Sequence, residues 1–444
     1  MTRHRPPSRS AQLEALFACP LIHDIAADLD ELSRRTRRHP LAMHLAFGAM
    51  SRLYRSGNRL DAELLSGDTW AWVVERYNKG AALHPRGVEM SPKTPVLLAD
   101  TYRHVRNLLT SDDHLDDLLL SFTEHSVALA NGLALLLQGR AGSRTRPHPS
   151  RTIYGDGTIV RPLYCKADKG RQDPDAEEHY RHDGQIYGND LVTIAARGVR
   201  ANQRLILAVG RVSERGHEAD EAIRLIRMVH AVAGDGIQAV VYDGAFRGVH
   251  HDLLMTELGL VVVNKVHASK REEERRIHRK VPLGQWSHSV RRRMCTHNLV
   301  AWNGSVHDAN FDDGGTLVLS EPLARKQIRR YDRGAGNGWR FSLGVTVPCP
   351  REPFVAWISP HRQPDERGAG RPDQLRLLPE SDPNFQTLYG KRNDSESINS
   401  AYKRTLIADR ASARGWRRQV LDFMSWGILV NTLATSQFEG PRYP

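Results

Sequence analysis

The chain has 444 residues, of which 40% are hydrophobic and 26% are charged. With its 35 glycines it has the apolar share of an ordinary globular protein, which excludes wholesale disorder and fibrous repeats. An unbroken apolar run of about 18 residues is absent, which excludes a membrane-spanning helix. The formal net charge of +12 favours a polyanionic partner, of which nucleic acid is the commonest.

The cysteines and the amino end indicate the compartment. The four cysteines are far apart and form no CxxC pair, which fits a reducing cytosol: Cys19, Cys165, Cys295 and Cys349. The segment Met1 to Ser10 is basic and rich in proline, but no apolar core follows it, so it does not resemble a secretory signal. We therefore expect a cytoplasmic protein.

Residues 1–138 are predicted to be helical. Apolar residues recur there at three- and four-residue spacings in five segments: Pro40–Tyr54, Leu60–Leu65, Thr69–Tyr77, Pro95–Leu109 and His114–Leu137. The second and third segments have the proportions of a helix-turn-helix, in which Gly67 takes the turn and Asp68 caps the second helix. This pair is either a DNA-reading element or an ordinary hairpin of a helical bundle.

A predicted linker, rich in Gly, Ser, Pro and Arg, covers residues 139–151. From residue 152 to 266 the periodicity changes to a β-β-β-α-β-α-β order, with segments at Arg151–Leu163, Leu191–Val199, Arg204–Val212, Glu218–Val232, Ile237–Tyr242, His250–Leu258 and Leu260–Val266. This order predicts an α/β (α+β) fold with a mixed sheet and flanking helices, because a repeating βαβα pattern is absent.

The remainder of the chain is predicted to contain a β-rich region and then helices. Short β-like segments run through residues 267–385, at Asn298–Trp302, Thr316–Leu319, Trp339–Val347 and Pro353–Ile358. Two basic clusters, Lys270–Lys280 and Arg291–Arg293, lie in the same region. The final part, residues 386–444, is predicted to be helical, and Val420–Thr435 is apolar enough to be buried.

Two aspartates stand at strand-associated positions. Asp156 lies in the first predicted strand of the mixed sheet, and Asp243 directly follows the fourth. Each Asp-Gly pair is also typical of a hairpin turn, so taken singly neither is specific. For Asp243 the turn interpretation is the weaker one, since ligands and metals collect at the carboxyl edge of a sheet.

The most specific feature is a group of four polar residues: Tyr389, Arg392, Glu396 and Lys403. The last three follow Tyr389 at offsets of 3, 7 and 14, which place all four in one narrow sector of a helix at about 100° per residue. The helix can also begin later, with an N-cap near residue 394, so that Tyr389 and Arg392 precede it. Together the four residues would present a carboxylate flanked by an aromatic ring and two cations.

The spacing Y-x2-R-x3-E-x6-K resembles the motif of the DDE transposases of bacterial insertion sequences, in particular the YREK-type group. Asp156 and Asp243 also stand where that family places its first two acids, 243 − 156 = 87 residues apart, and Glu396 follows 396 − 243 = 153 residues later. The resemblance covers residues 150–435 and implies an RNase H-like catalytic domain, made of residues 152–266 and 386–444, with residues 267–385 as a β-rich insertion. One departure is the flank Gly244–Arg247, which lacks the group's usual acidic and arginine-rich character.

The resemblance implies cut-and-paste transposition of an insertion sequence. Asp156, Asp243 and Glu396 would be catalytic metal ligands for two Mg²⁺ ions, with Mn²⁺ able to substitute. Arg392 and Lys403 would contact DNA phosphates, and Tyr389 would pack against the DNA end. The implied partners are the terminal inverted repeats, the target DNA and a second copy of the chain in the synaptic complex, without a membrane, in a bacterial, nucleoid-associated setting. Residues 1–138 would bind the DNA ends.

The chemistry agrees with the resemblance independently. Phosphodiester transfer needs charge neutralisation at the scissile phosphate and an activated hydroxyl, which two metal ions supply. Mg²⁺ prefers a few carboxylates with water and substrate oxygens, and three acids from distant segments provide such a set.

Several alternatives remain open. A non-catalytic DNA-binding protein derived from a transposase, or a related metal-dependent nuclease, would share these residues. Two histidine–cysteine groups also have residue types that bind Zn²⁺, although chance grouping among 21 histidines explains them more simply: Cys165 with His179 and His182, and Cys295 with His297 and His307.

Overall fold

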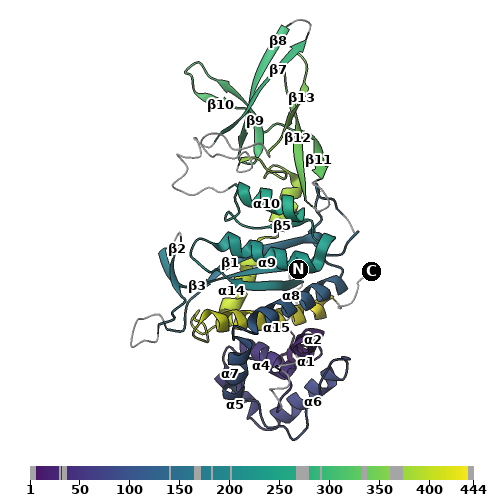
Figure 1. Ribbon diagram of the computed structural model, residues 1–444, viewed down its shortest axis with the longest axis vertical. Coiled ribbons are helices and arrows are strands. Elements are labelled where there is room, and N and C mark those ends of the chain that lie inside the picture. Colours follow the sequence, from purple (N-terminus) through teal and green to yellow (C-terminus); the bar gives the residue numbers. More distant parts are fainter. Residues whose placement is uncertain are drawn as a thin grey trace. The chain divides into compact units, whose positions relative to one another are not determined.

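The computed structural model describes residues 7–29, 32, 38–139, 142–164, 172–181, 184–200, 203–266, 280–290, 293–332, 338–360 and 374–438. The chain divides into two compact units (Figure 1). Unit 1 comprises Met1–Leu136, Gly155–Gly234 and Asp394–Pro444, and unit 2 comprises Leu137–Tyr154 and Asp235–Asn393. In the described part of the chain, no helix combines the length and apolar character needed to cross a membrane.

The first part of unit 1 is helical, as predicted. Its helices are α1 (Arg9–Phe17), α2 (Pro20–Asp28), α4 (Leu41–Leu53), α5 (Gly57–Leu64), α6 (Thr69–Ala81), α7 (Ala99–Leu109) and α8 (Leu115–Gly132). The five predicted segments are confirmed, and α1 and α2 are additional. Helix α8 ends before the predicted Leu137, because Ala134 and Leu136 take positive φ angles of 64° and 53°, which an α-helix does not accommodate.

The rest of unit 1 is a sheet with helices packed on it. Its elements are the later part of β1 (Thr152–Val160), then β2 (Glu177–Arg181), β3 (Gly184–Arg197), β4 (Arg204–Arg211), α9 (Glu218–Ala233), α14 (Asn393–Arg404) and α15 (Trp416–Phe438). Strand β3 pairs antiparallel with β2 and β4 and neighbours β1. Helices α8, α9 and α15 contact β4. The apolar stretch predicted to be buried lies in α15.

One buried side chain compensates for an irregularity in this sheet. The register between β3 and β4 shifts beside Ile206, so the backbone there is not held by regular ladder bonds alone. Asn431 of α15 accepts from the Ile206 N–H at 2.7 Å and donates to the Ile206 carbonyl at 2.8 Å. Because Asn431 is fully buried, these bonds satisfy backbone groups that water cannot reach.

Unit 2 begins with the parallel part of the sheet. Strand β5 (Ala239–Val241) pairs in parallel with the first residues of β1, starting with Thr152 opposite Ala239, and β6 (Val261–Val263) pairs in parallel with β5. Helix α10 (Gly248–Leu258) connects β5 to β6. The predicted order β-β-β-α-β-α-β is therefore confirmed, with β2 as one extra strand.

The region predicted to be β-rich forms two antiparallel sheets within unit 2 (Figure 1). One has the order β10-β9-β8-β7 and the other the order β11-β12-β13. The strands are β7 (Val281–Val290), β8 (Arg293–Trp302), β9 (Ser305–Phe311), β10 (Leu317–Leu319), β11 (Arg325–Asp332), β12 (Trp339–Val347) and β13 (Phe354–Ile358), and the short helix α13 (Pro383–Tyr389) follows.

The predicted fold class is confirmed: the chain is α/β (α+β), with a mixed sheet, flanking helices, a β-rich segment and an all-α amino-terminal part. Strands β7, β9 and β11 were not predicted. In β11 all but one of the eight residues are exposed, so the strand shows no apolar alternation.

Candidate active site

Asp156 is a buried carboxylate in the interior of strand β1. Its side chain is 8% exposed, and its Oδ2 accepts a hydrogen bond of 2.8 Å from the Asn399 amide of α14. The interpretation of Asp156-Gly157 as a hairpin turn is wrong, because β1 continues to Val160. Gly157 has another explanation: a Cβ there would lie 2.6 Å from the carboxylate of Glu218.

Glu396 lies on the same helix as Asn399, three residues earlier. Residues three apart on a helix are neighbours on one face, with Cβ atoms about 5–6 Å apart. Asn399 is 5% exposed and also donates to the Gly157 carbonyl at 3.3 Å, so this face of α14 is held against β1. Glu396 itself is exposed, so unit 1 places an exposed acid one helical turn before the residue that binds Asp156.

The four-residue motif does not lie on a single helix. Tyr389 is the last residue of α13, residues 390–392 form the connection, and α14 begins at Asn393. The single-helix version of the prediction is therefore wrong, and the version with a later start is confirmed, although the start precedes residue 394 by one position. Glu396 and Lys403, seven residues apart, still share one face of α14.

Asp243 follows β5 in unit 2 and takes part in a turn. Its Oδ1 accepts from the Ala245 N–H at 2.8 Å, which is the local bond expected of an aspartate before glycine. Its Oδ2 lies 4.0 Å from Nη2 of Arg392, and both side chains are partly exposed. The amide of Asn264 donates to the Asp243 carbonyl at 3.0 Å and fixes the backbone at this position. One carboxylate oxygen of Asp243 thus stabilises the turn, and the other lies near the Arg392 guanidinium.

Tyr389 and Arg392 lie together near Asp243 in unit 2. The Tyr389 ring stacks on Phe385 with 4.9 Å between centroids. Lys265 Nζ and the Arg392 guanidinium lie 5.8 and 5.9 Å from the Tyr389 centroid. Burial raises the pKa of the Tyr389 hydroxyl, so this group stays neutral at physiological pH. Of the predicted group, Tyr389 and Arg392 thus lie beside Asp243, and the second cation at the ring is Lys265, which was not predicted.

Within the described ranges, no group of three or more His, Cys, Asp or Glu side chains is arranged so that it could hold a metal ion. The acids of the prediction are divided between the two units, with Asp156 and Glu396 in unit 1 and Asp243 in unit 2. Their oxygen atoms are the ligand type that Mg²⁺ takes.

The predicted helix-turn-helix corresponds to α5 and α6. Gly67 has a φ of 51° in the turn, as predicted, but the Asp68 side chain makes no capping hydrogen bond. The two cations that α6 carries pair with acids of the same unit, Arg76 with Glu14 at 3.4 Å and Lys79 with Glu75 at 2.6 Å. The role of residues 1–138 at DNA ends stays a prediction.

Other sequence features lie partly outside the described residues. This holds for most of the Lys270–Lys280 cluster, for Arg291 and Arg292, and for Cys165 and His182. His307 lies on the other face of the sheet from Cys295 and His297, because its register partner on β8 is Val300. Its Nδ1 bonds the Ser320 carbonyl at 2.7 Å.

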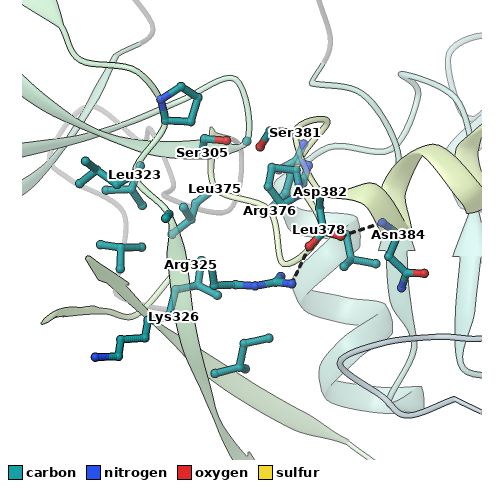
Figure 2. A pocket seen from close by; sticks show the side chains of 18 of the residues that line it. Ser305, Leu323, Arg325, Lys326, Leu375, Arg376, Leu378, Ser381, Asp382 and Asn384 are labelled. Atoms are coloured by element: carbon teal, nitrogen blue, oxygen red, sulfur yellow. Dashed lines mark hydrogen bonds and ion pairs between the residues drawn. The ribbon is translucent and has the colours of Figure 1, made fainter. Parts of the chain in front are cut away.

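A pocket of about 970 Å³ lies in unit 2 (Figure 2). In Figure 2, Arg325 reaches across it to Asp382, with 2.5 Å between Nη2 and Oδ2. Asp382 also accepts from the Asn384 N–H at 2.8 Å, where it caps α13. None of the predicted site residues lines this pocket, so it is distinct from the candidate active site.

Comparison with protein-family models gives no match, and comparison with curated proteins gives none either. Asn399 is the site residue that the sequence reasoning missed. A signal was present, since Asn399 follows Glu396 by three residues and so faces the same way on a helix. What the sequence could not supply was the strand that this face meets.

Proposed function

We propose that the protein is a DDE-type transposase that moves an insertion sequence by metal-dependent DNA cleavage and strand transfer. The observation that carries the proposal is the bond between Asn399 and Asp156, one helical turn from Glu396. It supports a site in which two of the three acids of the motif act together, although 396 − 156 = 240 residues separate them.

The proposal requires Asp243 to join this pair. Asp243 follows the carboxyl end of β5, and such ends are where α/β proteins place ligands. The strand order and the β-rich segment between Asp243 and Glu396 further support the RNase H-like assignment.

The donor set fits magnesium. Three carboxylates and one amide oxygen are hard ligands of the kind that Mg²⁺ prefers. Asn399 Oδ1 is buried without a hydrogen-bond partner, and a cation or its bound water would satisfy this oxygen. Asp156, Asp243 and Glu396 would hold the ions, with Mn²⁺ as a substitute. When bound, the ions would neutralise charge at the scissile phosphate and lower the pKa of the attacking water.

The chain's own residues would orient the DNA. Asn399 would fix the rotamer of Asp156, so little side-chain entropy is lost when the site assembles. Arg392 and Lys403 would bind phosphates and Tyr389 would pack against the DNA end, which positions the substrate without reading its sequence. Water would first hydrolyse the phosphodiester and release a 3′-hydroxyl, and this hydroxyl would then displace a 3′-oxygen in the target strand.

The proposed partners follow from this chemistry. They are the terminal inverted repeats, the target DNA and a second copy of the chain in the synaptic complex. The proposed setting is the nucleoid of a bacterial cytoplasm.

A strand-joining assay tests the proposal. Labelled duplexes carrying the DNA on either side of the gene are incubated with the full chain, a supercoiled plasmid and Mg²⁺. We expect label to become covalently joined to the plasmid. Nicking without joining would indicate a nuclease, and binding without either reaction a non-catalytic protein; both results would overturn the proposal.

A further inference from the structure

A cation outside the four-residue motif lies at the same edge of the sheet as Asp243. The parallel strands β5 and β6 are in register up to Val241 and Val263. Asp243 and Lys265 each follow these residues by two positions. The residue before Lys265, Asn264, donates to the Asp243 carbonyl at 3.0 Å, so the two strand ends stay side by side. Lys265 therefore lies at the carboxyl edge of the parallel strands, where α/β proteins place ligands.

The Lys265 ammonium and the Arg392 guanidinium share one aromatic ring, that of Tyr389. Lys265 Nζ lies 5.8 Å from the ring centroid, and the guanidinium carbon of Arg392 lies 5.9 Å from it. Both distances are within the range of about 6 Å in which an aromatic face attracts a cation. The ring is itself stacked on Phe385 of α13. One partly buried tyrosine thus holds two cations together.

Each of the two cations faces one acid. Arg392 lies near Asp243, as described above, and Lys265 Nζ lies 3.6 Å from Oε2 of Glu380. The Lys265 and Glu380 side chains are 56% and 43% exposed, so water reaches both charges. The separation exceeds the length of a good hydrogen bond, so Glu380 attracts the ammonium without accepting one of its N–H donors.

Stabilisation of the fold does not account well for this pair. An exposed ion pair contributes little to stability, because water competes for both charges. The same loose contact is easily exchanged for another anion. A phosphate has the charge of a carboxylate and is a common ligand of lysine ammonium groups. Lys265 also lies beside the ring that holds Arg392, which is itself proposed to bind phosphate.

We propose that Lys265 is a further DNA-binding residue of the candidate site, and that Glu380 occupies its ammonium until a DNA phosphate replaces the carboxylate. This inference rests on the proposed function, because the phosphate belongs to the DNA end placed at Tyr389 and Arg392. The exchange leaves the Lys265 charge paired and releases the Glu380 carboxylate to water. Glu380 thereby weakens the binding of any DNA that does not reach Lys265.

DNA binding in the absence of Mg²⁺ tests the inference apart from cleavage. Labelled duplexes carrying the DNA on either side of the gene are titrated with the full chain at several salt concentrations, and fluorescence anisotropy gives the affinity. Lys265→Ala should lower the affinity and reduce the slope of log K against log salt by about 0.9, the value for one phosphate contact. Lys265→Arg keeps the charge and should retain the wild-type slope. A purely structural role of Lys265 would leave the slope unchanged in both variants.

Glu380→Gln tests the role of the acid. It should raise the DNA affinity about two- to fivefold, the range expected for one exposed ion pair that no longer competes. In the Lys265→Ala background the same change should have little effect, because the competition acts through the ammonium. The matched control is Glu321→Gln, which removes the charge of another exposed glutamate of unit 2 and should leave the affinity unchanged.

The outcomes distinguish this inference from the proposed function. A Lys265→Ala variant with the wild-type salt slope would overturn the inference and leave the proposed function standing. So would a gain of affinity in Glu380→Gln that persists in full without Lys265. The expected changes in binding, together with a failure to join DNA strands, would overturn the proposed function alone.

Discussion

The bond between Asn399 and Asp156 gives the sharpest prediction about the candidate site. Asn399→Ala removes a hydrogen bond to a carboxylate, and such bonds contribute about 1.5–3 kcal/mol to stability. Since both side chains are at least nine-tenths buried, water does not replace the lost donor. We expect the free energy of unfolding to fall by about 2 kcal/mol, which is roughly a 30-fold change in the folding equilibrium. DNA cleavage should fall as well, because Asp156 loses its fixed rotamer.

The isosteric change Asn399→Asp tests whether Asp156 belongs to a metal-binding site or only takes part in packing. It places a second carboxylate against Asp156, and two such charges 4 Å apart repel by about 4 kcal/mol at an effective dielectric constant of 20. Without divalent cations this variant should therefore be less stable than Asn399→Ala. Millimolar Mg²⁺ should restore a large part of the loss in Asn399→Asp and little of it in Asn399→Ala.

Urea denaturation followed by far-UV circular dichroism, with and without Mg²⁺, measures both effects. The control is Asn107→Ala, since Asn107 is an exposed asparagine of unit 1 whose hydrogen bond to Arg418 lies at the surface. It should change the free energy of unfolding by less than about 0.5 kcal/mol. An Asn399→Ala variant as stable as the control would contradict the role of this hydrogen bond in stability. An Asn399→Asp variant whose stability does not change with Mg²⁺ would contradict cation binding at this position.

Three further predictions concern the fold of unit 1. Asn431→Leu should lower the free energy of unfolding by about 3 kcal/mol in urea titrations, because it leaves two buried backbone groups of Ile206 unsatisfied; no change would contradict the bulge-capping role. Gly80→Ala should lower the thermal unfolding midpoint strongly, because the added Cβ would lie 2.2 Å from a backbone oxygen of α1. In the control Gly132→Ala the added Cβ meets nothing within 4 Å, so this variant should be neutral or more stable by up to about 1 kcal/mol. Burial lowers the pKa of His44 to about 3, so below pH 6.5 this histidine binds a proton in the unfolded chain but not in the folded one. The free energy of unfolding should therefore fall by up to about 1.4 kcal/mol per pH unit from pH 6.5 toward 3. In urea titrations at pH 7 and 5, the stability of His44→Leu should depend less on pH than that of the wild type.

Elements with a strong local signal were predictable from the sequence. Residues 41–53 have the apolar spacing of a helix. Residues 218–233 begin with an acidic first turn and are followed by a glycine, which is also typical of a helix. In both segments the helix is predictable from adjacent residues alone. The strand around Asp156 was also found, because its apolar residues and β-branched flanks are local. Strand β11 has no such local pattern, because its residues are almost all exposed and mostly charged. It forms a strand by pairing with β12, and this partner cannot be identified from the residues of β11 themselves.

The candidate site shows the same division between local and tertiary information. The motif residues Glu396 and Lys403 were found by spacing, and the break after Tyr389 was an open alternative. The contact of Asn399 with Asp156 depends on how a helix meets a strand 240 residues earlier, which no local pattern encodes.

The most direct test of the central claim is cleavage of end-labelled DNA by Glu396→Gln, which keeps the shape of the side chain but removes its charge. We expect this variant to bind the DNA ends within a few-fold of the wild type and to lose Mg²⁺-dependent nicking, because a metal ligand is gone. The matched control Glu124→Gln, at an exposed glutamate on α8, should nick at the wild-type rate. Nicking by Glu396→Gln at the wild-type rate would contradict the assignment of the catalytic acids.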